Sequence, residues 1–276
     1  MGMVFEERST GSDRARYVWI LVALGCAAFA LWSRPAIPQN PAYHLMADQR
    51  PALGVSNGLN VVSNVPFALV GGLGLVATLR RRDDGSPVFE EPWLRWPYAL
   101  LFLGTAVTAL GSSYYHLAPD NARLVWDRLP MTLVCMGLVT AVLAECVDVR
   151  LARQLFLPLV VAAAGSVGYW RWTELHGVGD LRPYALAQYG SLLAIVLLLA
   201  LYPGRFREAR YLAAGLCAYG VAKILELADA PVYAASGHIV SGHTLKHLVA
   251  AGGLAMIAAM IHKRGAAPIE APQPRE

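Results

Sequence analysis

The chain has 276 residues, of which 56% are hydrophobic and only 15% are charged, and its mean hydropathy is +0.44. Soluble domains carry more charge and less apolar surface, so this composition excludes soluble Rossmann, barrel and sandwich folds. The 23 Lys and Arg residues exceed the 19 Asp and Glu residues by a formal charge of only +4. The basic residues lie in short clusters between apolar blocks, so nucleic-acid binding has no support.

Apolar blocks of roughly 20 residues recur along the chain, which is the length that crosses about 30 Å of hydrocarbon at about 1.5 Å per residue. Breaks rich in charge, Pro or Gly separate these blocks. The pattern predicts an all-α, polytopic membrane helical bundle with spans at residues 17–33, 57–79, 94–116, 124–146, 153–170, 183–202, 209–228 and 238–262. We expect a single integral membrane domain.

The two ends of the chain differ from this pattern. The first block follows Arg14 and Arg16 and resembles a signal peptide. Its apolar part is long and no small-residue cleavage site follows it, so we interpret it as an uncleaved first span. Residues 264–276 are rich in Pro, Ala and Glu, and we expect a disordered tail there.

The distribution of Lys and Arg predicts the orientation, because positive residues accumulate in cytoplasmic loops. With alternating spans, fifteen basic residues lie on the side of the N-terminus and six on the other side. Both termini are therefore expected in the cytoplasm. The short loops and the Ala, Arg and Gly content are compatible with a bacterial inner membrane.

A few polar side chains lie at the ends of predicted spans. Ser112 and His116 are four residues apart at the end of the third span and so share one helix face. Asp127 follows one short loop later, at the same expected membrane level. His243 and His247, also four apart, open the last span. Alternating spans bring all these segments to the non-cytoplasmic side.

Three neutral imidazoles next to a carboxylate are what an open catalytic zinc site requires, because the fourth position stays free for water. Bound zinc lowers the pKa of that water toward about 7. Each residue also has a structural interpretation: a membrane histidine can pack by hydrogen bonding, a serine can bond its own backbone, and Asp127 can favour a helix N-terminus. These interpretations do not account for the coincidence of the five residues at one depth.

Three motifs together resemble the alkaline ceramidases, in a superfamily of seven-helix membrane hydrolases that includes the adiponectin-receptor-like proteins. The motifs are Gly-Ser-x-x-x-His ending at His116, Asp-x-Leu-Pro-Met beginning at Asp127, and His-x-x-x-His from His243 to His247. The segment 57–64, with its Asn-x-x-Ser-Asn run, is similar to the first core helix of that family. The resemblance covers a seven-helix core at 57–262, to which the span 17–33 is additional.

The resemblance implies that His116, His243 and His247 bind zinc. It implies that Asp127 orients or deprotonates the water and later protonates the leaving amine, and that Ser112 donates a hydrogen bond to the developing oxyanion. The implied function is a zinc-dependent intramembrane amidohydrolase that cleaves a ceramide-like N-acyl lipid into a fatty acid and a sphingoid-type amine. The implied partner is the lipid substrate, and no obligate protein partner is evident.

The sequence departs from the family pattern at two places. Lys246 stands where the eukaryotic enzymes have an aromatic residue, which puts ceramide itself in doubt as the substrate. We expect Lys246 to pair with Glu226 or Asp229, and Lys223 lies three residues before Glu226. Those enzymes also bind calcium through an acidic segment.

Only Asp48 resembles the calcium-binding segment, and Asn57 replaces an acid there, so these two residues are the candidates for a calcium site. Two other functions stay open at this point. One is a seven-helix lipid-sensing receptor or adaptor with a structural zinc site. The other is a membrane cytochrome, since bundle histidines also ligate haem, although an i,i+4 pair suits one metal ion better.

Overall fold

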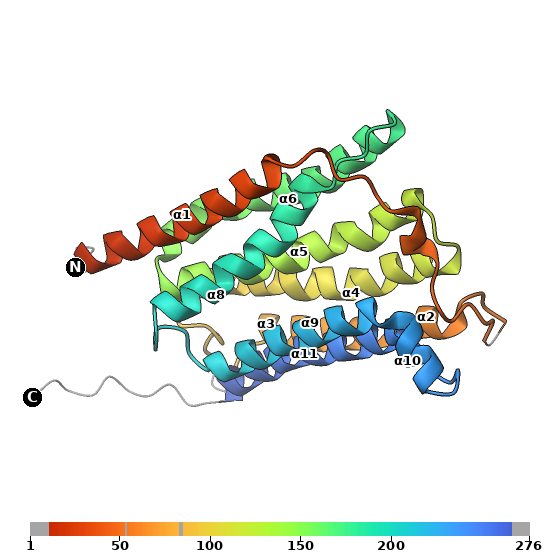
Figure 1. Cartoon of the computed structure of the whole chain (residues 1–276). Helices are drawn as coiled ribbons and strands as arrows, with labels where there is room; N and C mark the ends of the chain where they lie inside the picture. Colours follow the sequence, from red (N-terminus) through yellow and green to blue (C-terminus); the bar gives the residue numbers. More distant parts are fainter. Residues whose placement is uncertain (1–10, 53, 83–84, 267–276) are drawn as a thin grey trace, which may run out of the picture.

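A computed structural model describes residues 11–52, 54–82 and 85–266 of the chain, and this part of the protein is almost entirely helical (Figure 1). The α-helices are α1 (Gly11–Trp32), α2 (Gly58–Val62), α3 (Val65–Leu79), α4 (Arg95–Leu117), α5 (Asn121–Cys146), α6 (Val149–Leu175), α7 (Arg182–Ala185), α8 (Ser191–Leu201), α9 (Ala209–Leu227), α10 (Asp229–Ala235) and α11 (Gly242–Ala266). Short helical turns are η1 (Pro41–His44), η2 (Pro92–Leu94) and the π-helical η3 (Leu186–Gly190). In the described ranges, β-pairing is limited to two isolated bridges.

These helices confirm the all-helical fold, and their length and apolar composition are compatible with a multi-pass membrane bundle. Six helical segments among the described residues are long and apolar enough to cross a membrane, and α9 with α10 makes a seventh if the bent pair is one span. Every predicted span corresponds to one of the helical segments. The helix α4, predicted as a span at 94–116, is not among the apolar six because its Gly, Thr, Ser and Tyr residues lower its hydropathy.

The position of α4 explains this composition. It lies between α3 and α5 and contacts both along its length. The crossings of α4 with α3 and with α5 are so close that a Cβ on certain glycines would overlap backbone of the neighbour. For example, Gly71 faces Ala106, Gly111 faces the Trp126 carbonyl, and Gly137 faces Leu101. Small residues allow membrane helices to approach in this way. The bundle therefore places the end of α4 next to the start of α5.

The first helix lies at the periphery. Only 6% of its apolar window is buried, and it packs on α8 and η3. Figure 1 shows α1 on the outer side of the bundle, with its start at the same end as the end of α11. The additional helix that the sequence predicted is thus separate from the inner helices that carry the polar residues.

Local breaks differ from the simple pattern of spans. The span predicted at 57–79 is divided into α2 and α3 at Ser63 and Asn64, and α9 turns into α10 with a bend of 80°. The last helix begins at Gly242, four residues later than predicted. The prediction of a disordered tail from residue 264 is wrong for its first residues, because residues 264–266 continue α11. The rest of that tail, residues 267–276, lies outside the described residues.

Candidate metal centre

Three buried histidines from two helices meet at the end of the bundle that also holds α2 and α10 (Figure 1). His116 comes from the last turn of α4, and His243 and His247 come from the first two turns of α11. The Nε2 atoms of His116 and His243 are 3.3 Å apart. One ligand atom from each of the three rings lies within 4.8 Å of the others. The predicted trio is therefore one cluster in space.

The three histidines lie close enough to bind one metal ion, and their donor atoms are compatible with zinc. Two nitrogens that are each about 2.0–2.1 Å from one tetrahedral ion lie about 3.3–3.4 Å apart, and this matches the separation of His116 and His243. Three neutral imidazoles leave the fourth coordination position open. Haem needs its axial ligands on opposite faces of a wide macrocycle, so nitrogens 3.3 Å apart suit a single ion instead.

Hydrogen bonds favour one tautomer in two of the rings. With the Ser63 hydroxyl donating to the carbonyl of Asn60 (3.1 Å), its 2.8 Å contact with His247 is a bond donated by Nδ1–H. Nδ1 of His116 lies 3.3 Å from the Met46 sulfur, which can only accept. Both contacts favour a proton on Nδ1, and this tautomer leaves the Nε2 lone pair free for a metal.

Polar contacts hold the first turn of α11 in place. One Asp229 carboxylate oxygen accepts from the His243 backbone N–H (2.7 Å) and the other from that of Ala47 (2.8 Å). The Thr244 hydroxyl donates to the buried Asn60 side chain (2.9 Å), whose amide donates to the Asp48 carbonyl. These bonds connect α10, α2 and the loop before α2 to the helix that carries two of the histidines, and such bonds orient the ligands at metal sites.

Ser112 and Asp127 lie beside the cluster. Ser112 is buried on α4, and the Asp127 carboxylate on α5 interacts with its hydroxyl. Both residues line a cavity of about 370 Å³ together with His247. The glycine at position 111 permits this arrangement because α4 touches the α5 backbone there. The structure thus brings the two predicted catalytic residues to one cavity wall.

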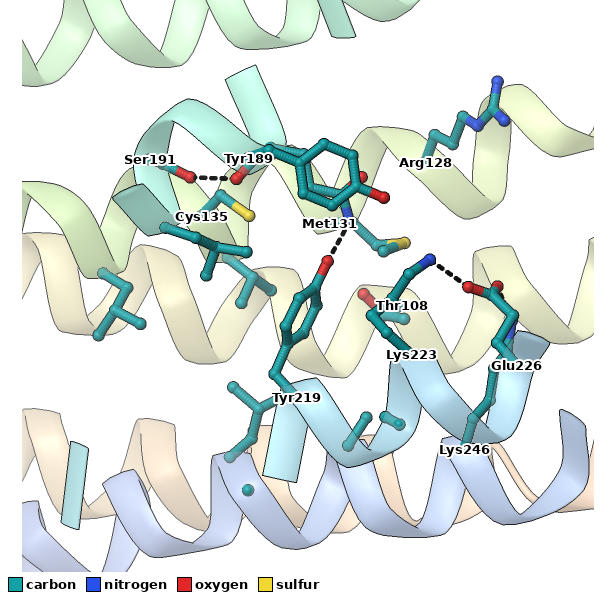
Figure 2. A pocket seen from close by; sticks show the side chains of 18 of the residues that line it. Thr108, Arg128, Met131, Cys135, Tyr189, Ser191, Tyr219, Lys223, Glu226 and Lys246 are labelled. Carbon is teal, nitrogen blue, oxygen red and sulfur yellow. Dashed lines mark hydrogen bonds and ion pairs between the residues drawn. The ribbon is translucent and has the colours of Figure 1, made fainter. Parts of the chain in front are cut away.

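The cavity also receives the charged residues of α9 and α11. Glu226 pairs with Lys246 (2.6 Å) and with Lys223, and the pair with Lys223 is visible in Figure 2. The predicted ion pair of Lys246 with Glu226 is confirmed. The alternative prediction, a pair of Lys246 with Asp229, is wrong, because the Asp229 carboxylate accepts hydrogen bonds from the backbone of α11 and of the loop before α2.

The two candidates for calcium have protein partners instead. The buried Asp48 carboxylate binds Arg50 through Nε (2.9 Å) and Nη2 (2.8 Å), and these bonds lower the pKa of Asp48. The Asn57 side-chain amide donates to the His116 carbonyl (2.9 Å). A guanidinium at the carboxylate disfavours a cation there, so this geometry gives calcium no support.

Several site residues were not predicted. Met46 and Asp229 contact the cluster or its helix, but neither stands in a motif near the histidines in sequence. Ser63 belongs to the Asn-x-x-Ser-Asn run, and this motif could have indicated that Ser63 lies at the site.

Comparison of the chain with family models, with curated proteins and with solved structures found no match. The resemblance to alkaline ceramidases therefore rests on its motifs alone.

Proposed function

We propose that this protein is a zinc-dependent membrane hydrolase that cleaves the amide bond of a long-chain N-acyl lipid. The observation that carries the proposal is the 3.3 Å approach of two Nε2 atoms in a buried trio of histidines. Ser63 and Met46 leave the lone pairs of two of these rings available to an ion. The adjacent cavity supplies a carboxylate and a hydroxyl at the same depth.

Each site residue has a defined task in this proposal. The three histidines hold zinc, which supplies Lewis acidity at an open coordination position. Asp127 accepts a proton from the attacking water and returns it to the leaving amine, so one water is consumed and a fatty acid and an amine are released. Ser112 donates a hydrogen bond to the carbonyl oxygen as negative charge develops on it.

The lining of the cavity suits an acyl chain. On α11 the residues that line the cavity are polar near the start of the helix, at Lys246 and His247, and apolar further on, at Ile257. On α9 they are polar near the end of the helix, at Glu226, and apolar near its start, at Leu212. The apolar part thus continues away from the histidines along both helices. A cavity of a few hundred Å³ whose surface is mostly apolar is typical of sites for small lipophilic molecules.

Metal analysis and hydrolysis together test the proposal. We expect purified protein to contain one zinc per chain and to hydrolyse a fluorescent N-acyl sphingoid lipid, and His116→Ala to lose both properties. His262→Ala is the matched control, because His262 is an exposed histidine of α11. Zinc without turnover on any acyl amide or ester would instead favour the lipid-sensing receptor or adaptor. Equal zinc and turnover in His116→Ala would refute both functions.

The orientation is part of the proposal. The basic residues place both termini in the cytoplasm, and the histidine cluster then lies near the non-cytoplasmic surface. A bacterial inner membrane is the proposed location.

A further inference from the structure

The cavity next to the histidines carries more positive than negative side chains. Its charged lining residues are the cations Arg128, Lys223 and Lys246 and the carboxylates Asp127 and Glu226. Glu226 is bound by both lysines, so this group of three keeps one positive charge. A neutral lipid such as ceramide gives no reason for excess cations in a largely apolar cavity, where charge is costly.

Arg128 is the least satisfied of these groups. Its side chain is 6% exposed and forms no ion pair within the described part of the chain. One terminal nitrogen donates to the Gln39 side chain, whereas Nη1 is buried without a hydrogen-bond partner. A guanidinium donor in this state costs free energy until an acceptor reaches it.

Aromatic rings hold the guanidinium at the wall of the cavity. Its central carbon lies 4.4 Å from the ring centre of Trp170, 4.9 Å from that of Tyr184 and 5.8 Å from that of Tyr43. Tyr43 and Tyr184 line the same cavity, and Tyr43 also donates to Glu226. Figure 2 shows Arg128 extending from α5, apart from the pair formed by Lys223 and Glu226. The rings fix the cation and provide no anion, so the charge stays available to a ligand.

We propose that Arg128 binds an anionic group on the amine side of the lipid, so that the substrates are acidic N-acyl lipids, with a sulfonate, phosphate or carboxylate, and not neutral ceramide. The acyl chain occupies the apolar part that ends near Ile257, and the acidic group meets Arg128 near the loop that contains Tyr43. This inference rests on the proposed function, because it names the substrate class of the same site.

A matched pair of probes tests the charge alone. N-dodecanoyl taurine and N-dodecanoyl ethanolamine share the acyl amide and differ in a sulfonate against a hydroxyl. Binding is measured as ligand-induced thermal stabilisation in detergent, and hydrolysis as KM and kcat. We expect wild-type protein to bind the taurine amide at least about tenfold more tightly, which is the value of one charge-assisted hydrogen bond. Arg128→Gln should lose this preference and keep its affinity for the ethanolamide.

Two further variants separate the site from general effects. Arg123→Gln removes a basic residue from the same helix at a position paired with Asp120 outside the cavity, and it should keep the full preference. Lys223→Gln removes a partly exposed cation of the cavity and should weaken binding of the taurine amide by about threefold or more. This variant tests the inference independently if Arg128→Gln does not fold.

The outcomes distinguish this inference from the proposed function. Equal binding of the two probes by wild-type protein, or an unchanged preference in Arg128→Gln, would overturn the anionic site even if both amides are hydrolysed. Methanesulfonate alone, if it binds as tightly as the lipid, would overturn the assignment to a lipid. If neither amide is hydrolysed but the preference depends on Arg128, the anionic site stands and the hydrolase proposal fails.

Discussion

The hydrogen bonds of Ser63 favour one tautomer of His247. Because the Ser63 hydroxyl donates to the Asn60 carbonyl, it accepts from His247 and turns the free lone pair of that ring toward the other histidines. The sequence pattern predicted the three histidines, since their spacing of four and their helix ends are local features. It could not assign this tautomer, which depends on a contact between residues 184 positions apart.

Removing that serine should weaken metal binding. We expect Ser63→Ala to lower the zinc affinity by about 10–100-fold, the usual loss when a hydrogen-bond partner of a ligating histidine is removed. Competition with a calibrated chelator measures this affinity. Ser166→Ala is the control, because the Ser166 hydroxyl bonds only the Ala163 carbonyl of its own helix. An affinity equal to that of wild-type protein would mean that Ser63 does not orient the ligand.

A second residue-scale prediction concerns pH. Arg50 holds the pKa of Asp48 below its ordinary value of 3.8. The ionised carboxylate therefore stabilises the folded state fully above that ordinary value, and this contribution is lost as the pH falls through the lower folded pKa. We expect Asp48→Asn to be less stable than wild type at pH 6 and the difference to shrink below about pH 4. Thermal unfolding in detergent across this range measures it, and a difference independent of pH would contradict the assignment.

At the scale of the helices, hydropathy predicted most of the bundle, because each span must be apolar over its whole length. The positions at which helices begin, end or bend were harder to predict. The start of α11 involves contacts with other segments, such as the bonds that Asp229 makes to Ala47 and His243. The short α10 has no apolar period of its own, so nothing local distinguishes it from a loop.

The crossing of α4 and α5 gives a prediction about helix packing. A Cβ at Gly111 would lie 2.0 Å from the Trp126 carbonyl oxygen, whereas a Cβ at Gly168 on α6 meets nothing within 4 Å. We expect Gly111→Ala to lower the free energy of unfolding by about 1–3 kcal/mol through overpacking. Gly168→Ala should be neutral or stabilising by up to about 1 kcal/mol because Ala favours helix. Thermal unfolding of both variants measures the contrast, and similar effects of the two substitutions would contradict the close crossing.

At the scale of the whole molecule, α1 begins and α11 ends at the same end of the bundle, and the histidines lie at the other end (Figure 1). In the proposed orientation, which follows from the count of basic residues, the first end lies in the cytoplasm. A fluorescent protein fused to the C-terminus should therefore be bright, and alkaline phosphatase fused there should be inactive. The reverse result would mean that the bundle has the opposite orientation and that the histidine cluster lies near the cytoplasmic surface.

Metal should also stabilise the whole fold, because the ligands come from α4 and α11 and a bound ion joins them. Ligand binding to the folded state alone adds about 4 kcal/mol at a thousandfold excess over its dissociation constant. We expect treatment with a chelator to lower the unfolding temperature of wild-type protein and to leave that of His116→Ala unchanged. An equal decrease in both would show that the chelator acts elsewhere.

X-ray absorption at the zinc edge tests the central claim most directly, because it reports the atoms around the ion. The convergence of His116, His243 and His247 predicts three imidazole nitrogens at about 2.0–2.1 Å and a fourth light ligand. A spectrum with sulfur at about 2.3 Å, or with fewer than three imidazoles, would contradict the site.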